Sequence, residues 1–269
     1  MSLRQRFPTA MALLGVLFAV VQWAPPAVFF GVLQLLILIS LAEFYGLAGR
    51  RHLQPRMAAG VPLVLLIGAA FFFPSRLPLG LVLFLILFLS GLIFLAAAST
   101  VEKVVAFPAA IALTVFGALY IGFTLNHLFW IQMERGPLYL YFFFGTIFLG
   151  DSGAYLFGKL LGRHKMTPLA SPNKTWEGSL GGLLFAVIGA MAARTLLLKH
   201  VGLADAAICG LCLHAVAQIS DPVESLFKRA AGVKDSSNLL PGHGGFLDRV
   251  DSLLLAAPFF YYFILYFWD

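Results

Sequence analysis

Residues 79–99 read LGLVLFLILFLSGLIFLAAAS, a stretch of 21 residues without a single charged side chain. A helix needs roughly 20 predominantly apolar residues to cross the hydrocarbon core of a bilayer. Apolar stretches of similar length recur along the whole chain. The pattern therefore predicts an all-α polytopic membrane protein.

The composition excludes the other fold classes. Of the 269 residues, 61% are hydrophobic and 11% are charged, against about 25% charged in an ordinary soluble domain. The mean hydropathy is +0.92. A soluble globule of this size has too little interior for so much apolar surface, and disorder requires the opposite composition. Two cysteines cannot build a disulfide scaffold, and continuous apolar runs do not fit the alternating strands of a membrane barrel.

Nine segments meet or approach the length of a membrane span. The first and third are short, and the fifth is interrupted by Pro108, so it is either one long helix or a span followed by a surface turn. Arg4 and Arg6 precede an apolar run as in a signal peptide, but no suitable cleavage site follows, which favours a first transmembrane helix. The predicted spans are 7–23, 27–47, 57–73, 79–99, 104–130, 137–161, 179–198, 203–219 and 252–268.

The distribution of Lys and Arg predicts the orientation of these spans. With nine spans, 14 of the 18 Lys and Arg residues lie on the side of the N-terminus and four on the other side. Cytoplasmic loops carry such an excess, so we expect a cytoplasmic N-terminus, a C-terminus on the opposite side, and a location in the inner (cytoplasmic) membrane. The net charge of +6 then reflects topology, and no nucleic-acid polymer is expected as a partner.

Two connections are long, 162–178 and 220–251, and both are predicted to lie in the cytoplasm. Loops longer than about 12–15 residues in a compact protein are usually functional or disordered, and neither of these is of low complexity. Charge is concentrated in the last 120 residues or so. We therefore predict a scaffold and lipid-groove region over residues 1–135 and a catalytic region over residues 136–269.

Residues 220–251 carry five of the twelve acidic residues together with four Lys and Arg residues. Clustered carboxylates beside clustered cations are typical of a metal ion bound with phosphate, and a hard cation such as Mg²⁺ takes oxygen ligands. The alternative is a solvated charged loop with incidental ion pairs. Glycines 242, 244 and 245 around His243 indicate close backbone approach to a ligand, which favours the functional interpretation.

Asp221 and Pro222 have the pattern of a helix start. Asp221 is a good N-cap, Pro222 suits the first helical position, and Glu224 completes a capping box. Asp221, Ser225 and Lys228 then lie on one helical face.

The flanks of the loop 162–178 add further candidates. Asp151 lies inside an apolar span, and an acid within a membrane span is a functional candidate. Lys174 is a candidate phosphate ligand, whereas Trp176 suits an interfacial anchor. The glycine pairs 158/162 and 178/182 have the G-x-x-x-G spacing of helix packing.

The charged residues of 225–251 resemble the C-terminal motif of the phosphatidate cytidylyltransferases, or CDP-diacylglycerol synthases. The run 171–178, SPNKTWEG, also resembles that family, as does Asp151 with Ala154 and Tyr155. The close resemblance covers roughly residues 145–255, and the earlier spans match only in hydrophobic character. The motif residues are Ser225, Lys228, Arg229, Lys234, Asp235, Pro241, His243, Gly244, Gly245, Asp248, Arg249 and Asp251.

The resemblance implies that CTP and phosphatidic acid react to CDP-diacylglycerol and pyrophosphate, in an enzyme that is a homodimer. We hypothesise that a phosphatidate oxygen attacks the α-phosphorus of CTP in line, with catalysis by positioning and charge neutralisation. The expected metal ligands for Mg²⁺ are Asp221 and Asp248, supported by Asp151, Asp251 or Glu224, and a second cation is compatible with them. The expected catalytic residues are Asp221, Asp248, Lys228, Arg229, His243 and Arg249. The expected substrate-binding residues are Lys174, Ser225, Lys234, Gly244, Gly245, Asn173 and Glu177.

Two other functions fit parts of this pattern. A CTP-dependent polyprenol kinase would transfer the γ-phosphoryl group and release CDP. A transporter of an anionic substrate would also use intramembrane Asp151, but transporters often show two corresponding halves, and this chain has no internal repeat.

Overall fold

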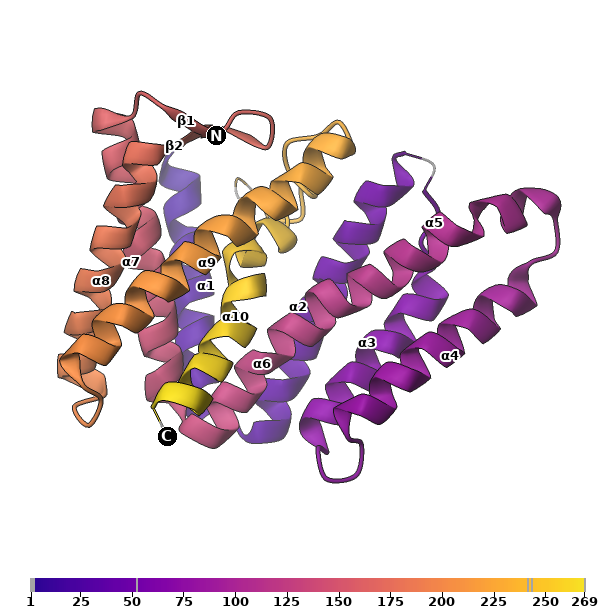
Figure 1. The fold of residues 1–269 in the computed structure, drawn as a ribbon, viewed down its shortest axis with the longest axis horizontal. Coiled ribbons are helices and arrows are strands. Elements are labelled where there is room, and N and C mark those ends of the chain that lie inside the picture. The colour runs from indigo at the N-terminus through magenta and orange to yellow at the C-terminus, as the bar shows by residue number, and fades with distance from the viewer. Residues whose placement is uncertain (1–2, 52, 241, 243, 269) are drawn as a thin grey trace. The chain divides into compact units, whose positions relative to one another are not determined.

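The computed structural model describes residues 3–51, 53–240, 242 and 244–268, and it leaves the side chains of residues 3–10 and 13 undescribed. His243, one of the expected catalytic residues, lies outside the described residues. Helices dominate the described chain (Figure 1). They are α1 (Leu3–Trp23), α2 (Pro26–Gly49), α3 (Met57–Phe72), α4 (Leu79–Ala97), α5 (Val101–Gly117), α6 (Thr124–Trp130), α7 (Pro137–Leu161), α8 (Trp176–Leu197), α9 (Leu203–Ala230) and α10 (Leu247–Phe267).

Within the described residues, seven helices are long and apolar enough to cross a membrane. The shorter apolar helices are Leu14–Trp23 and α3, which correspond to the first and third predicted spans. The all-α polytopic membrane class is therefore confirmed, and the count of nine spans stays a prediction.

The fifth predicted span is one continuous helix over Val101–Arg135. Thr100 caps its start, because the Thr100 hydroxyl accepts a hydrogen bond from the backbone N–H of Lys103. Pro108 lies inside the helix without ending it. Two π-helical stretches, η1 (Ala118–Phe123) and η2 (Ile131–Arg135), flank α6. Of the two alternatives that Pro108 left open, the long helix is present.

The predicted helix start at Asp221 is wrong, because α9 continues through Asp221 and Pro222 to Ala230. Pro222 lacks an N–H and disfavours a helix interior, but side-chain pairs one turn apart support the helix around it. The Ser225 hydroxyl donates to Asp221 Oδ1 at 3.3 Å, and Lys228 pairs with Glu224. Since α9 ends at Ala230 and α10 begins at Leu247, the loop predicted over residues 220–251 comprises only residues 231–246.

The loop 162–178 contains a short antiparallel hairpin that the all-α prediction omitted. Strand β1 (Lys165–Thr167) pairs with β2 (Ser171–Thr175). Strands of three and five residues are too short to show a clear alternation, and Pro172 in β2 is tolerated because a two-stranded sheet has only edge strands. Thr175 ends the hairpin and caps α8, since its hydroxyl accepts from the N–H of Gly178 at 3.1 Å.

The chain divides into two compact units. Unit 1 comprises Met1–Phe129 and Ala230–Arg249, and unit 2 comprises Trp130–Arg229 and Val250–Asp269. The predicted division at residue 135 concerns function and stays a prediction.

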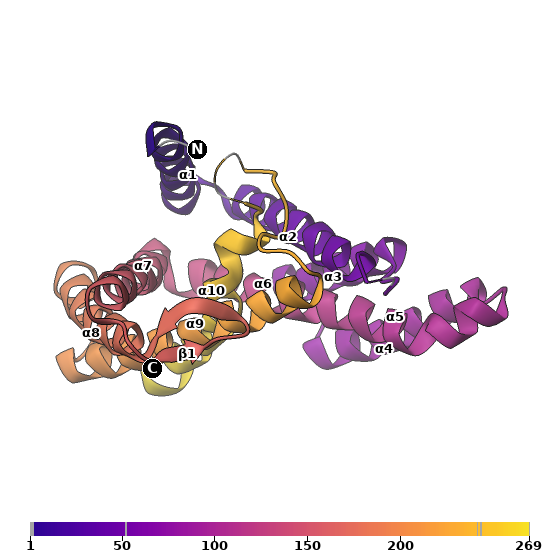
Figure 2. The same ribbon diagram turned by 90° about the horizontal axis from the view of Figure 1, so that it is seen from above.

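In unit 1, helices α3, α4 and α5 pack together, with α4 and α5 side by side (Figure 2). Buried polar contacts join α2 to the long helix. The Tyr45 hydroxyl donates to the carbonyl of Thr114 at 2.6 Å, and the Gln34 amide donates to Asn126 at 2.7 Å. Partnered polar groups of this kind fix the register of packed helices without leaving buried donors unsatisfied.

In unit 2, α7 and α8 lie side by side with the β1–β2 hairpin at one end of the pair (Figures 1 and 2). Their close approach depends on glycine. A Cβ added at Gly178 would lie 2.9 Å from the carbonyl oxygen of Ala154 and 3.1 Å from the Cα of Gly158. The predicted helix-packing role is confirmed for Gly158, Gly178 and Gly182. The close approach places α7, α8 and the hairpin around one cavity.

Candidate active site

Unit 2 contains a cavity of about 320 Å³ between α7, the hairpin, α8 and α9. Polar residues come from each of these elements, so the cavity depends on the packing of all four. Those that bear on its chemistry are Asp151, Tyr155, Asn173, Lys174, Ser179, Gln218 and Asp221.

An ion pair joins two walls of this cavity. Lys174 Nζ on β2 lies 2.9 Å from Asp221 Oδ2 on α9, and their side chains are 26% and 33% exposed. The charges are therefore accessible from the cavity, and an anionic ligand could compete for the lysine. Asp151 on α7 is exposed and lines the same cavity. The structure thus brings together Asp151, Asn173, Lys174 and Asp221, four residues predicted separately from two distant parts of the sequence.

The amide of Gln218 connects α9 to α8 by two hydrogen bonds, close to the Lys174–Asp221 ion pair. Gln218 Nε2 donates to the carbonyl of Ser179 at 3.0 Å, and the Ser179 hydroxyl donates back to Gln218 Oε1. This reciprocal pair fixes the distance between the two helices one turn before Asp221. Gln218 and Ser179 did not emerge from the sequence, since neither belongs to a charged cluster.

The last turns of α9 hold a second pair of charges in the interior. Lys228 Nζ lies 2.5 Å from Glu224 Oε2, with the two side chains 8% and 0% exposed. Each charge compensates the other, because an isolated charge would be strongly destabilising when buried. The metal role expected for Glu224 and the phosphate role expected for Lys228 stay predictions.

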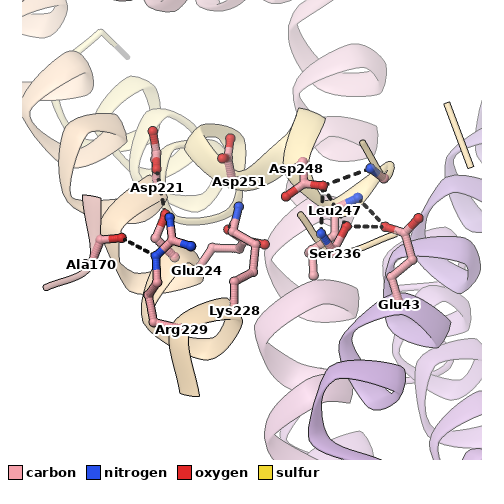
Figure 3. Close-up of polar contacts among 12 residues, drawn as sticks. Glu43, Ala170, Asp221, Glu224, Lys228, Arg229, Ser236, Leu247, Asp248 and Asp251 are labelled. Carbon is pink, nitrogen blue, oxygen red and sulfur yellow. Dashed lines mark hydrogen bonds and ion pairs between the residues drawn. The ribbon is translucent and has the colours of Figure 1, made fainter. Parts of the chain in front are cut away.

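Arg229 and Ser220 connect α9 to neighbouring segments of unit 2. Arg229 Nε donates to the carbonyl of Ala170 at 3.1 Å, which holds the turn of the hairpin against the end of α9 (Figure 3). The Ser220 hydroxyl donates to the backbone carbonyl of Asp251 and accepts from the N–H of Leu255 at 3.2 Å. The backbone around Asp251 in α10 is thereby positioned, and a role for its carboxylate in metal binding stays a prediction.

Glu177 contacts the segment before β1 and does not belong to the described residues that line the cavity. Its carboxylate accepts from the N–H groups of Arg163 at 3.1 Å and His164 at 3.2 Å, and it lies 2.5 Å from His164 Nδ1. Glu177 therefore ties the start of α8 to the segment that leads into β1. The substrate-binding role expected for it stays a prediction.

A separate acidic cluster lies in unit 1, around the segment 236–248. Asp248 Oδ2 accepts from the N–H of Ser236 at 2.9 Å, from the Ser236 hydroxyl at 2.9 Å, and from the N–H of Gly245 at 2.8 Å (Figure 3). Gly244 has a φ of +78°, which favours glycine, and a Cβ there would lie 2.6 Å from Asp248 Oδ2. Asp248 thus organises this segment, and the metal role expected for it stays a prediction.

Glu43 on α2 is the functional candidate that the sequence reasoning missed. Its carboxylate accepts hydrogen bonds from Ser236, Ser237, Phe246 and Leu247. An acid within the apolar span 27–47 was the available signal, of the same kind that singled out Asp151. The basic residues expected in this region, Lys234 and Arg249, have exposed side chains.

The donor set of the cavity fits a hard cation. Within the described ranges, no group of three or more His, Cys, Asp or Glu side chains is close enough to form a metal site by itself. Mg²⁺ usually takes only one or two carboxylates, with water and substrate phosphates completing its coordination. Asp151 and Asp221, which line one cavity with Lys174, meet that requirement.

Apolar helices of membrane length, together with a cavity lined by charged side chains, define an integral membrane protein with a polar site in unit 2. A family model described as the cytidylyltransferase family matches residues 4–267. The chain therefore belongs to the cytidylyltransferase family.

Several curated relatives are named phosphatidate cytidylyltransferase. One from Staphylococcus epidermidis is 39% identical over 147 residues, which are 55% of this chain and 56% of the relative. One from Haemophilus influenzae is 42% identical over 133 residues, 48% of this chain and 46% of the relative. One from Staphylococcus aureus is 43% identical over 130 residues, which are 48% of this chain and 50% of the relative. The matched part of the chain spans about half the length of these relatives.

Proposed function

We propose that the chain transfers the CMP moiety of CTP to phosphatidic acid, giving CDP-diacylglycerol and pyrophosphate for phospholipid synthesis. The observation that carries the proposal is the accessible Lys174–Asp221 pair beside Asp151 in one cavity, in a chain of the cytidylyltransferase family. The relatives' name supports phosphatidate as the acceptor.

In the proposed reaction, a phosphate oxygen of phosphatidate attacks the α-phosphorus of CTP, and the bond to the β-phosphate oxygen breaks. The phosphatidate headgroup is ionised near neutral pH, so the residues of the site need not remove a proton from it. Lys174 holds a phosphate by charge-assisted hydrogen bonds once it leaves Asp221. The chain's contribution is then to orient the two anions in line and to neutralise the charge that develops on pyrophosphate.

We propose Mg²⁺ as the cofactor, held by Asp221 and Asp151 at the cavity of unit 2. A metal role for Asp248, in unit 1, is proposed from the family motif alone. When bound, the cation neutralises phosphate charge and raises the electrophilicity of the α-phosphorus. A second cation is compatible with this number of carboxylates, and the chain's own residues serve chiefly to bring the substrate phosphates into its reach.

The proposal extends to the setting of the enzyme. We propose nine spans in the inner membrane, a cytoplasmic N-terminus and a site that faces the cytoplasm, where CTP is found. The 14-to-4 distribution of Lys and Arg supports this orientation. A homodimer, expected from the family resemblance, belongs to the same proposal.

The test uses purified protein in mixed micelles with phosphatidic acid, Mg²⁺ and CTP labelled at the α-phosphate. Label should enter the lipid together with the release of pyrophosphate, and EDTA should reduce both to background. Excess Mg²⁺ added after EDTA should restore them, which separates metal removal from denaturation. Release of CDP without transfer of the label would contradict the proposal and would show that the γ-phosphoryl group of CTP is the group transferred.

A further inference from the structure

We propose that Glu43 is a positioning residue that anchors the segment 236–247 to α2 and thereby sets the orientation of Asp248. The effect expected on kcat rests on the proposed function, because Asp248 belongs to the family motif. All residues involved belong to unit 1.

Four hydrogen bonds converge on the Glu43 carboxylate. Oε1 accepts from the Ser237 hydroxyl at 2.6 Å and from the N–H of Phe246 at 3.1 Å. Oε2 accepts from the Ser236 hydroxyl at 3.1 Å and from the N–H of Leu247 at 2.7 Å (Figure 3). One side chain therefore holds both ends of the segment 236–247.

The burial of Glu43 makes these contacts strong. Glu43 is only 9% exposed, and a buried carboxylate is tolerated when several donors replace its hydration. Two of the four donors are backbone N–H groups at the start of α10, where a helix leaves donors unsatisfied and favours negative charge. Glu43 thus caps α10 from another helix, about 200 residues away along the chain.

Ser236 couples Glu43 to Asp248. Its hydroxyl lies 3.1 Å from Glu43 Oε2 and 2.9 Å from Asp248 Oδ2. The Ser236 hydroxyl has one proton, so it donates to one carboxylate at a time. The backbone N–H of Ser236 continues to donate to Asp248. A change in Glu43 therefore alters the hydrogen bonding of Asp248 through a single shared group.

Gly245 shows how closely the segment is fitted to Glu43. A Cβ at this position would lie 2.5 Å from Glu43 Oε2 and 2.6 Å from Oε1. The glycine in the family motif is thus explained by the approach of a carboxylate from α2, a helix outside the part of the chain that carries the resemblance.

A second contact from the same end of α2 holds the other end of the loop 231–246. Arg51, two residues beyond α2, donates from Nε to the carbonyl of Ala230, the last residue of α9. A cation near the C-terminus of a helix is favourable. The end of α2 therefore anchors this loop at both of its termini.

The experiment compares Glu43→Gln with Ser40→Ala. Ser40 is a fully buried residue in the same helix, and its hydroxyl has no hydrogen-bond partner among the described residues, so this control removes a buried polar atom without touching the segment. Amide hydrogen exchange of residues 231–246 is measured without substrates, followed by kcat and KM for CTP. Loss of a supporting hydrogen-bond partner typically reduces activity by about 10–100-fold.

We expect Glu43→Gln to raise exchange in residues 231–246 and to lower kcat by about 10–100-fold with little change in KM for CTP. Glu43→Asp should recover part of the loss because it keeps the charge. The double variant Glu43→Gln with Ser236→Ala should lose less kcat, expressed as a free energy, than the sum of the losses in the two single variants. The reason is that both substitutions act on one hydroxyl.

Unchanged exchange, or a kcat equal to that of Ser40→Ala, would overturn the proposal. If Glu43→Gln does not fold, Ser237→Ala, which removes one of the four donors, serves as the milder variant with the same criteria. Raised exchange in a protein whose wild-type form transfers no CMP would retain the anchor and refute the proposed function instead.

Discussion

The cavity of unit 2 and the acidic cluster of unit 1 use the same residue types in opposite ways. Asp221 accepts from one hydroxyl and pairs with one accessible lysine. Asp248 is 8% exposed, and its Oδ2 accepts from two backbone N–H groups and one hydroxyl. A carboxylate whose partner is a mobile side chain can exchange it for a ligand. One held by backbone donors stabilises the fold around it.

Replacement of Asp221 is expected to separate activity from stability most clearly. Asp221→Asn should lower CMP transfer by at least about 10²–10³-fold, because it removes a charge that faces the reacting phosphates. Stability should fall by less than about 1 kcal/mol, since a partly exposed ion pair contributes little. The assay is CMP transfer together with thermal unfolding in detergent.

Asp205→Asn is the matched control for Asp221→Asn. Asp205 is an exposed acid in the first turn of the same helix, α9, so its replacement should leave transfer near the wild-type rate. Near-normal turnover of Asp221→Asn would remove Asp221 from both the metal site and the catalytic residues.

Replacement of Asp248 is expected to lower stability much more than replacement of Asp221, in addition to any loss of activity. Asp248→Asn weakens three hydrogen bonds to a buried carboxylate, each worth about 1.5–3 kcal/mol when one partner is charged. We expect a drop of about 2 kcal/mol or more in the free energy of unfolding, with raised hydrogen exchange in residues 231–246. A variant as stable as the wild type would show that the contacts of Asp248 are not structural.

Replacement of Lys174 tests the substrate side of the comparison. Lys174→Gln should raise KM for CTP by about tenfold, the equivalent of about 1.4 kcal/mol, because one charge-assisted phosphate contact is lost. Lys165→Gln is the control, since Lys165 is an exposed lysine in the partner strand of the hairpin. Equal effects of the two variants would indicate general attraction of an anion rather than a contact by Lys174.

The membrane helices could be predicted because the bilayer imposes a length and an apolar composition that are visible locally. The end of α9 could not, because Asp221 and Pro222 locally favour a helix start, and yet α9 continues through them to Ala230. Lys174, Asp221 and Asp151 could be proposed one by one as charges in or near apolar spans. Glu43 was missed because its partners lie 193 to 204 residues away, and nothing in the sequence near Glu43 identifies them.

The smallest expected effect concerns the attachment of the hairpin that carries Lys174. Arg229→Lys keeps the charge but removes the Nε–H that donates to Ala170, because lysine lacks the planar fork of arginine. The hairpin should become more mobile, and kcat/KM for CTP should fall by about 2–10-fold, the equivalent of about 0.5–1.5 kcal/mol for one hydrogen bond.

Arg194→Lys provides a control of the same chemistry for Arg229→Lys. Arg194 Nε donates to the carbonyl of Val201 at 2.6 Å, but Arg194 lies in the last turn of α8, about 24 Å along the helix from Gly178 at the cavity. It should change stability without changing KM for CTP. If Arg229→Lys also leaves kcat/KM for CTP unchanged, Arg229 supports the fold alone, and the position of Lys174 does not depend on the turn at Ala170.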